Sequence, residues 1–436
     1  MNPALNLEVP AHSTGDVQAL SSLSDWLAYM ERIHPQSIAM GLDRVLKVKK
    51  TLKLDPAFPI ITVAGTNGKG STCAMLEAVL HAAGYSVGSY TSPHLQRFNE
   101  RVRVGLAPAS DAALIEAFGR IENARGDTPL TYFEFATLAA AVIFSGAKLD
   151  AAVLEVGLGG RLDAVNAFDG DCAIVTSVAM DHMDYLGDTR EQIGFEKAGI
   201  FRGGKPAICA DSDPPASAIA HAKNIGADWQ CLGHDFSFTA ETNEWRFSGR
   251  RGRRSGLPAP ALRGAYQLHN ACAALAALDE LRAALPVTMN DIRAGLVQVE
   301  LPGRFQILPG RPLLILDVAH NPHAAASLAA NLKAMRHVGK TLAVFAMLGD
   351  KDIHGVIGEV KSEIDEWHVA GISDRRGAPR EHIERELERH GIRPRVFSSI
   401  VEAYEHAVLS ARDSDRILVF GSFHTVGDVL RHRALL

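Results

Sequence analysis

Patterns of buried strands alternate with helical patterns along most of the chain. Short runs of apolar and β-branched residues, typical of buried parallel strands, recur at 59–63, 85–90, 150–156, 173–178 and 205–210. Between the strand runs, apolar residues follow helical spacing, as in 72–84, where Gly84 ends the pattern. Alternation of this kind predicts an α/β fold with a parallel sheet covered by helices.

The alternation restarts after Leu301-Pro-Gly-Arg304, which predicts a second unit. Four further strand runs alternate there with helices that begin near 324, 354, 380 and 400; the strand runs are 313–318, 342–346, 366–369 and 417–420. We therefore place one unit at 1–300 and a smaller doubly wound, Rossmann-like α/β unit at 301–436.

Several segments depart from this alternation. Residues 1–20 have no periodicity and are predicted to be a loose tail, while 23–30 reads as a short helix. The segment 33–44 is interpreted as a connector that enters another helix. Residues 99–104 alternate like an edge strand, and 228–256 read as short antiparallel strands whose cluster Arg250-Arg-Gly-Arg-Arg254 is a solvated turn.

Composition narrows the functional class. The 436 residues are 47% apolar and 22% charged, an ordinary balance for a globular protein of two or three domains. The net charge of −5 gives no reason to expect a nucleic-acid partner. The first Lys or Arg is Arg32, no apolar run is long enough for a membrane span, and the five cysteines lack C-x-x-C spacing. We expect a cytoplasmic protein without disulfides, a zinc site or a membrane partner.

The segment Gly65-Thr-Asn-Gly-Lys-Gly-Ser71 follows the first buried strand and precedes a helix. This order of strand, glycine loop and helix makes a phosphate cradle, in which Lys69 supplies charge and Ser71 or Thr72 a hydroxyl near a metal. The match to G-x-x-x-x-G-K-[ST] is imperfect, because Val63 replaces the first glycine and Gly70 separates Lys69 from the serine. The pattern predicts an ATP-binding loop of an unusual subtype, with a purely structural glycine turn as the alternative.

Polar residues follow the ends of the next strands, where α/β proteins bind ligands. Ser92 either faces the same cavity as Lys69 or caps a turn. His182 also follows a strand end, but by itself it is only a weak indication of a metal site. Glu155 ends an apolar strand, and burying this carboxylate without a cation would cost several kcal/mol, which favours a metal ligand over an incidental acid. A capping box with Thr131 is a sufficient explanation for the presence of Glu134 at its position. From its spacing alone, Lys197 is interpreted as a solvated lysine on a helix.

In the second unit, two motifs also follow strand ends. They are Asp317-Val-Ala-His-Asn-Pro322 and Gly421-Ser-Phe-His-Thr425. Because both strands are expected to be parallel, both motifs should lie on one ligand-facing edge.

Eight motifs in order over both units resemble the Mur-ligase superfamily and, within it, the folate branch of folylpolyglutamate synthases, which in bacteria are often fused with dihydrofolate synthase activity. The resemblance runs from about Leu27 to Asp428. It rests on Gly65–Ser71, Thr91-Ser-Pro-His94, Glu155-Val-Gly-Leu-Gly-Gly-Arg-Leu-Asp163, Asp181-His182, Glu196-Lys-Ala-Gly199, Leu301–Arg304, Asp317–Pro322 and Gly421-Ser-Phe-His424. The glycine after the loop lysine is a feature of the folate branch.

The resemblance implies a central P-loop ATPase domain, a Rossmann-like C-terminal domain and a site in the cleft between them. It implies ATP contacts at Thr66, Asn67, Gly68, Lys69, Gly70, Ser71, Asn270, Arg304 and Asp317. Two Mg²⁺ ions would be held by Ser92, Glu155, His182 and a carbamate on Lys197. Pterin contacts would fall on Ile38, Ala39, Met40, Thr131, Tyr132, Phe133, Glu134, Leu162, Asp163 and Ala164, and the catalytic residues would be Lys69, His182, Lys197 and His320. Related bacterial enzymes commonly carry Asp where this chain has Ala39.

The implied reaction is ATP-dependent addition of L-glutamate to dihydropteroate and to reduced folates, through an acyl phosphate, by a monomer. A folylpolyglutamate synthase alone and a peptidoglycan Mur ligase are the nearer alternatives. A P-loop switch is a different class, and the absence of an N-K-x-D motif speaks against it.

Overall fold

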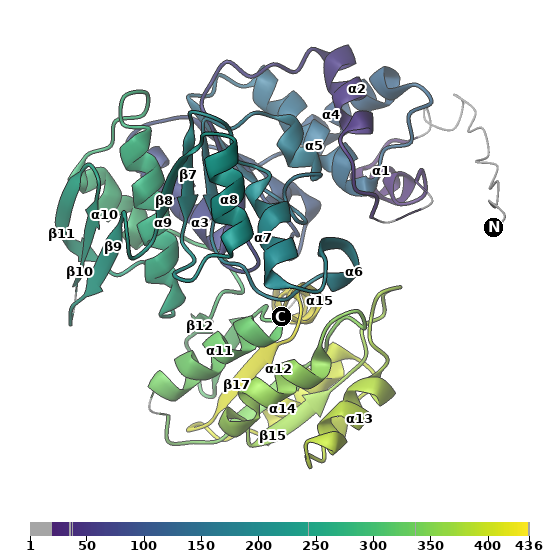
Figure 1. Ribbon diagram of the computed structural model, residues 1–436. Coiled ribbons are helices and arrows are strands. Elements are labelled where there is room, and N and C mark those ends of the chain that lie inside the picture. The colour runs from purple at the N-terminus through teal and green to yellow at the C-terminus, as the bar shows by residue number, and fades with distance from the viewer. Residues whose placement is uncertain (1–19, 35, 37, 243, 336, 435–436) are drawn as a thin grey trace.

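Two mostly parallel sheets, one in each half of the chain, organise the fold (Figure 1). The computed structural model describes residues 20–34, 36, 38–242, 244–335 and 337–434, and within them the first sheet has eight strands and the second six. The predicted tail over 1–20 lies outside the described residues, except for Leu20. The α/β fold expected from the sequence is confirmed.

The first sheet has β1 near its centre. The strand order is β4-β3-β2-β5-β1-β6-β7-β8. Their bounds are β1 Ile60–Ala64, β2 Val87–Tyr90, β3 Val102–Val104, β4 Ala107–Pro108, β5 Ala151–Glu155, β6 Cys172–Val175, β7 Pro206–Cys209 and β8 Asp228–Cys231. Val63 pairs with Glu155, and Ala64 pairs with Val175, so the parallel strands β1, β5 and β6 end at the same edge. The loops that leave these three strands are therefore brought together in space.

Both faces of β1 are buried, which explains its unbroken apolar sequence. Ile60 and Ala64 pack into a core with helices of one face, whereas Ile61 and Val63 pack into a second core on the other. The first core includes α1 Leu23–Met30, α2 Asp43–Leu52, α4 Asp111–Arg125, α5 Tyr132–Gly146, α7 Arg190–Ala198 and α8 Ala216–Asn224. The second includes α3 Lys69–Ala82, α9 Tyr266–Glu280 and α10 Met289–Gln298.

The expectation of short antiparallel strands over 228–256 is wrong for 228–231, which is β8 and pairs in parallel with β7, but the later part of the segment forms a separate three-stranded antiparallel sheet. It consists of β9 Ser237–Ala240, β10 Glu244–Gly249 and β11 Gly252–Pro258. The turn predicted for the cluster 250–254 is present only at Arg250 and Arg251, because Arg253 and Arg254 lie in β11, and the arginines of the turn are not simply solvated. Arg250 pairs with Asp228 and Asp235, and Arg251 pairs with Glu280 on α9. These ion pairs attach the hairpin to the first sheet and its helices.

The second sheet has the strand order β12-β13-β17-β14-β15-β16. The strands are β12 Gln306–Leu308, β13 Leu313–Asp317, β14 Thr341–Phe345, β15 Glu366–Val369, β16 Arg395–Val396 and β17 Arg416–Phe420. Only β12 is antiparallel to its neighbour in this sheet of described residues, and neither it nor β16 was predicted. The flanking helices are α11 Pro322–Ala334, α12 Ile353–Val360, α13 Arg380–Arg389, α14 Ile400–Ser410 and α15 Phe423–Ala434.

The edge strand predicted over 99–104 is wrong in two respects. Phe98–Arg101 form a 3₁₀ turn, so the strand begins only at Val102, and β4 rather than β3 lies at the edge. The cause is Glu100, whose carboxylate accepts backbone N–H groups of Leu95, Gln96 and Arg97. A side chain that satisfies three backbone donors stabilises a turn over an extended strand.

None of the helices in the described ranges is both long enough and apolar enough to cross a lipid bilayer.

We predict that Gly295→Ala destabilises the fold although alanine is the better helix former. A Cβ at Gly295 on α10 would lie 2.5 Å from Cα of Val79 on α3. Overpacking costs about 1–3 kcal/mol, which exceeds the roughly 0.5–1 kcal/mol that alanine gains over glycine inside a helix. Urea unfolding should therefore give a lower free energy of unfolding for this variant.

Gly119→Ala is the matched control, because nothing lies within 4 Å of a Cβ at that position of α4. This variant should be as stable as the parent protein or more stable. Equal stabilisation by both substitutions would contradict the close contact between α3 and α10.

Candidate active site

One cleft of about 840 Å³ receives loops from both sheets. Every residue proposed from the sequence for ATP, metal, pterin or catalysis lines it: Ile38–Met40, Thr66–Ser71, Ser92, Thr131–Glu134, Glu155, Leu162–Ala164, His182, Lys197, Asn270, Arg304, Asp317 and His320. Residues separated by more than 200 positions are thus brought together, while the role of each remains a prediction.

The glycine loop after β1 is closely packed against its surroundings. Gly65 and Gly68 have positive φ angles of 148° and 87°. A Cβ at Gly65 would lie 1.9 Å from Thr176 Oγ1, and one at Gly68 would lie 2.4 Å from Asn270 Oδ1. Only glycine fits at these two positions, because both the backbone conformation and the space exclude a side chain.

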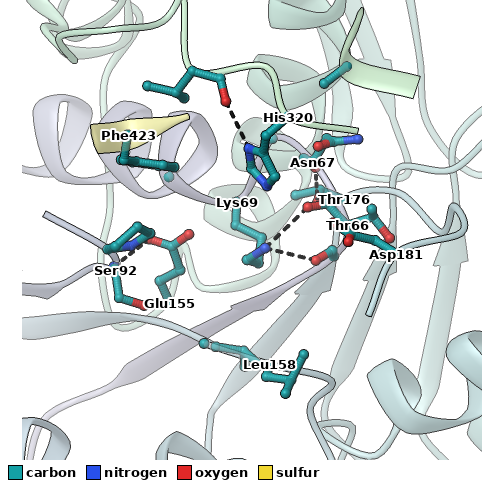
Figure 2. Close-up of a pocket in the computed structure, with 18 of the residues that line it drawn as sticks. Thr66, Asn67, Lys69, Ser92, Glu155, Leu158, Thr176, Asp181, His320 and Phe423 are labelled. Atoms are coloured by element: carbon teal, nitrogen blue, oxygen red, sulfur yellow. Dashed lines mark hydrogen bonds between the residues drawn. The ribbon is translucent and has the colours of Figure 1, made fainter. Parts of the chain in front are cut away.

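Lys69, the first residue of α3, folds back over this loop (Figure 2). Its Nζ donates to the carbonyl oxygens of Gly65 and Thr66 at 3.0 and 3.2 Å. The carbonyl of Asn67 accepts from Thr176 Oγ1 at 2.6 Å. The helix N-terminus and the ammonium of Lys69 together make an electropositive cradle for phosphate.

Glu155 lies at the end of β5 with a nearly inaccessible side chain. The residue is 4% exposed, and the backbone N–H of Ser92 donates to its Oε2 at 3.1 Å (Figure 2). Burial raises the pKa of Glu155, and the charge of Lys69 opposes this shift. A buried carboxylate with one neutral donor is suited to holding a cation.

His182 and Asp181 face Lys351, which the second unit contributes. Lys351 Nζ lies 2.7 Å from Asp181 Oδ1 and 3.0 Å from His182 Nε2. Burial lowers the pKa of His182 to about 4, so its imidazole is neutral at pH 7. For Asp181, burial is outweighed by His182, which is charged only in the acidic range where this carboxyl titrates, and by the charge of Lys351, so the pKa of Asp181 is lowered.

Lys197, on α7, is buried rather than solvated. It is 4% exposed, and its ammonium has no hydrogen-bond or ion-pair partner among the described residues. Burial, together with the charge of Lys69, lowers the pKa of Lys197 to about 7. The interpretation from spacing alone, a solvated helix lysine, is therefore wrong. A desolvated amine near neutrality is the chemical state that reacts with electrophiles such as CO₂.

The second unit supplies the opposite wall of the cleft. Arg304 stacks over the ring of Phe423 at 4.9 Å, and burial lowers its pKa while raising that of Asp317. Asp317 accepts backbone N–H groups of Phe305 and Ala319. Burial also lowers the pKa of His320 to about 4, and its Nδ1 lies 2.8 Å from the carbonyl oxygen of Val318 (Figure 2).

The predicted pterin segments form an aromatic and apolar end of the cleft. Thr131 caps α5 and forms a capping box with Glu134, as predicted. Asp163 accepts from the backbone N–H groups of Leu158 and Val165, and burial raises its pKa to about 7. Phe133 and Tyr90 pack with ring centroids 5.9 Å apart. This end can bury a flat heterocycle.

Sequence reasoning missed two residues by which the second unit contacts the first, Asn321 and Lys351. The amides of Asn67 and Asn321 exchange hydrogen bonds of 3.2 and 3.1 Å, and Asn321 also donates to Asp181. Asn321 lies in the motif Asp317–Pro322, but the sequence pattern gave it no role. Lys351 follows the end of β14, so the strand-end rule that found Glu155 could have found it.

The side chains proposed as metal ligands could hold divalent cations only with additional ligands and after a side chain has moved. Among the described residues, no group of three or more His, Cys, Asp or Glu side chains is arranged to hold a metal. To bind a metal ion, Glu155 would need the hydroxyl of Ser92 as a second ligand. Neutral His182 would need a negatively charged ligand beside it, such as a carbamate on Lys197. Because Lys351 contacts His182, a cation at this nitrogen requires Lys351 to move away.

Known proteins match both units. Residues 63–278 match the family model "Mur ligase middle domain", and 303–423 match "Mur ligase, glutamate ligase domain". The Dihydrofolate synthase/folylpolyglutamate synthase of Escherichia coli is 47% identical over 414 residues, covering 95% of this chain and 96% of its own length.

Solved structures give the same result. The structure titled "E.coli FolC in complex with DHPP and ADP" has a TM-score of 0.91 at 46% identity and covers 95% of this chain and 98% of its own. A "bifunctional folylpolyglutamate synthase/dihydrofolate synthase with Mn, AMPPNP and L-Glutamate bound" has a TM-score of 0.89 at 45% identity, with the same coverage.

We predict that Glu155→Gln folds normally but needs a much higher Mg²⁺ concentration. The amide keeps the size of the side chain but lacks the charge that holds a hard cation. Two measurements check this: the Mg²⁺ dependence of turnover, and thermal stabilisation by Mn²⁺ with a non-hydrolysable ATP analogue. An unchanged metal dependence in both would show that the acid merely ends a strand.

Proposed function

The chain belongs to the dihydrofolate synthase/folylpolyglutamate synthase family of Mur ligases, and we propose that it adds L-glutamate both to 7,8-dihydropteroate and to the γ-carboxylate of reduced folates. It is an ATP-dependent ligase that forms a carbon–nitrogen bond. The observation that carries the proposal is that a phosphate cradle from one unit and a cationic wall from the other face a single cleft.

ATP binding is proposed to engage both units. Thr66 to Ser71 surround the phosphates, with Lys69 as the fixed cation and Asn270 beside the loop. Arg304 and Asp317 reach the nucleotide from the second unit. The Asn67–Asn321 amide pair supports this arrangement, because it attaches the phosphate loop directly to the second unit.

The chemistry needs an activated carboxylate. A carboxylate becomes an acyl phosphate by accepting the γ-phosphoryl group, which the ammonium of Lys69 stabilises as charge develops. Two Mg²⁺ ions, proposed to be held by Ser92, Glu155, His182 and carbamylated Lys197, would supply further neutralisation of phosphate charge. The amine of glutamate then attacks, and phosphate leaves. His320 is neutral beside this centre and is proposed to assist the amine.

The two organic substrates are proposed to occupy opposite walls. The pteridine would lie among Ile38–Met40, Thr131–Glu134 and Leu162–Ala164, where the wall is largely apolar and aromatic. Glutamate carries two carboxylates, and cationic Lys351 and Arg431 line the wall from the second unit. If a carboxylate of glutamate attracts Lys351, the side chain leaves His182 free for a metal ion.

We further propose that the boundary between the two domains lies between residues 300 and 301. No strand of the first sheet extends beyond Cys231, and the second begins at Gln306 within the described residues. A monomer is proposed because both walls of the cleft are formed within this chain, so that no second subunit is needed to complete it. A cytoplasmic location is also proposed. Size-exclusion chromatography with light scattering tests the oligomeric state.

The function is tested by phosphate release from purified protein with ATP, Mg²⁺ and glutamate. Dihydropteroate and tetrahydrofolate are offered separately, and Lys69→Ala serves as the inactive control. Turnover of both acceptors is expected. Turnover of tetrahydrofolate alone would leave a folylpolyglutamate synthase, and inertness with both acceptors would contradict the proposal.

We predict that Lys197→Ala loses activity and that acetate restores part of it. A short carboxylate can occupy the position that the carbamate is proposed to fill, whereas chloride at equal ionic strength cannot supply two oxygen ligands. Carbon-13 NMR with labelled bicarbonate gives an independent measurement: a carbamate signal in the parent protein that is absent from the variant. Full activity of the variant without acetate would exclude the carbamate.

A further inference from the structure

We propose that Arg44, on α2, is a positioning residue for the acid substrate. It joins the segment Ile38–Gly41 to the N-terminal turn of α5, and these two segments line the same end of the cleft. Arg44 itself is not among the residues that line the cleft in the described ranges. The inference rests on the proposed function, because it assigns the acid substrate to this end.

The first contact is an ion pair with a buried carboxylate. Arg44 Nε donates to both oxygens of Glu134 at 3.0 and 3.1 Å, and a terminal nitrogen lies 2.9 Å from Oε1. The side chain of Glu134 is only 4% exposed, and that of Arg44 is 25% exposed. The planar guanidinium satisfies the carboxylate in a way that a lysine ammonium does not reproduce.

Glu134 passes this constraint on to the cleft. Its Oε2 accepts the backbone N–H of Thr131 at 2.8 Å, which fixes the first turn of α5. Thr131, Tyr132 and Phe133 in that turn line the cleft. The carboxylate therefore fixes where these side chains stand.

The second contact holds the loop. A terminal nitrogen of Arg44 donates to the carbonyl oxygen of Ala39 at 2.7 Å. Two residues further on, the N–H of Gly41 donates to the carbonyl of Leu162 at 3.2 Å. The loop is thus tied to α5 on one side and to the segment Leu162–Ala164 on the other. Three stretches of the acid-substrate end are connected by one arginine and one backbone bond.

The nucleotide end does not depend on these contacts. Lys69 is held by the carbonyls of Gly65 and Thr66, and Asn67 by Thr176 and Asn321. None of the hydrogen bonds of Arg44 among the described residues reaches that loop. Removal of Arg44 should therefore impair one substrate selectively, which a general loss of stability would not do.

The test compares Arg44→Ala and Arg44→Lys with the parent enzyme in steady-state kinetics. The KM for dihydropteroate should rise by about tenfold or more, since displacement of a binding wall by around 1 Å has effects of this size or larger. The KM for ATP and the thermal shift caused by ADP with Mg²⁺ should stay unchanged. In the Arg44→Ala variant, guanidinium ion at a concentration far below the denaturing range should lower the KM for dihydropteroate again. Potassium chloride at the same concentration should not.

Arg125→Ala is the matched control. Arg125 also donates to a carboxylate, that of Glu122, and to a backbone carbonyl, that of Thr128, but it is not among the residues that line the cleft in the described part of the chain. Its KM for dihydropteroate should equal that of the parent enzyme.

An unchanged KM for dihydropteroate in the Arg44 variants, equal rises for both substrates, or the same change in Arg125→Ala would overturn the inference. If Arg44→Ala does not fold, Arg44→Lys decides by the same criteria. Failure of the parent enzyme to use dihydropteroate would instead contradict the proposed function, before any variant is compared.

Discussion

Burial of charged side chains at one edge of a parallel sheet is the constraint on which the site depends. Glu155, Lys197 and Arg304 are desolvated there. Burial raises the pKa of Glu155 and lowers the pKa of Lys197 and of Arg304, which favours the neutral form of each group. Such charges are expensive to bury unless opposite charges compensate them. A divalent cation and nucleotide phosphates carry charges opposite to those of Glu155 and Arg304, so bound ligands can compensate these buried charges.

The same constraint explains why two units are needed. The phosphate loop belongs to the first sheet, whereas Arg304 and Lys351 come from beyond its last strand. An acyl phosphate hydrolyses in water, so a reaction through this intermediate would need both walls to close around it. In the described structure, hydrogen bonds between the amides of Asn67 and Asn321 join these walls. The ammonium of Lys351 also contacts the imidazole of His182 across the cleft. If His182 binds a metal ion as proposed, the contact between Lys351 and His182 has to break.

Errors of prediction occurred where a side chain satisfies the backbone or where a partner is distant in sequence. The alternation over 99–104 was correct as a pattern, but the carboxylate of Glu100 captures three N–H groups and produces a turn. The basic cluster at 250–254 was read as solvated, because its acidic partners at 228, 235, 279 and 280 are not adjacent to it in sequence. In both cases a polar side chain, not hydrophobic periodicity, decided the outcome.

The sequence by itself determined the α/β class, the phosphate loop and the residues at strand ends, because hydrophobic period and glycine spacing are local properties. It also carried the motifs that identify the family. Tertiary structure decided what these residues become: the lysine at 197 is buried, Lys351 faces His182, and Arg44 joins a loop to a helix. Desolvation and cross-chain hydrogen bonds depend on neighbours far away in sequence, and only the folded chain specifies those neighbours.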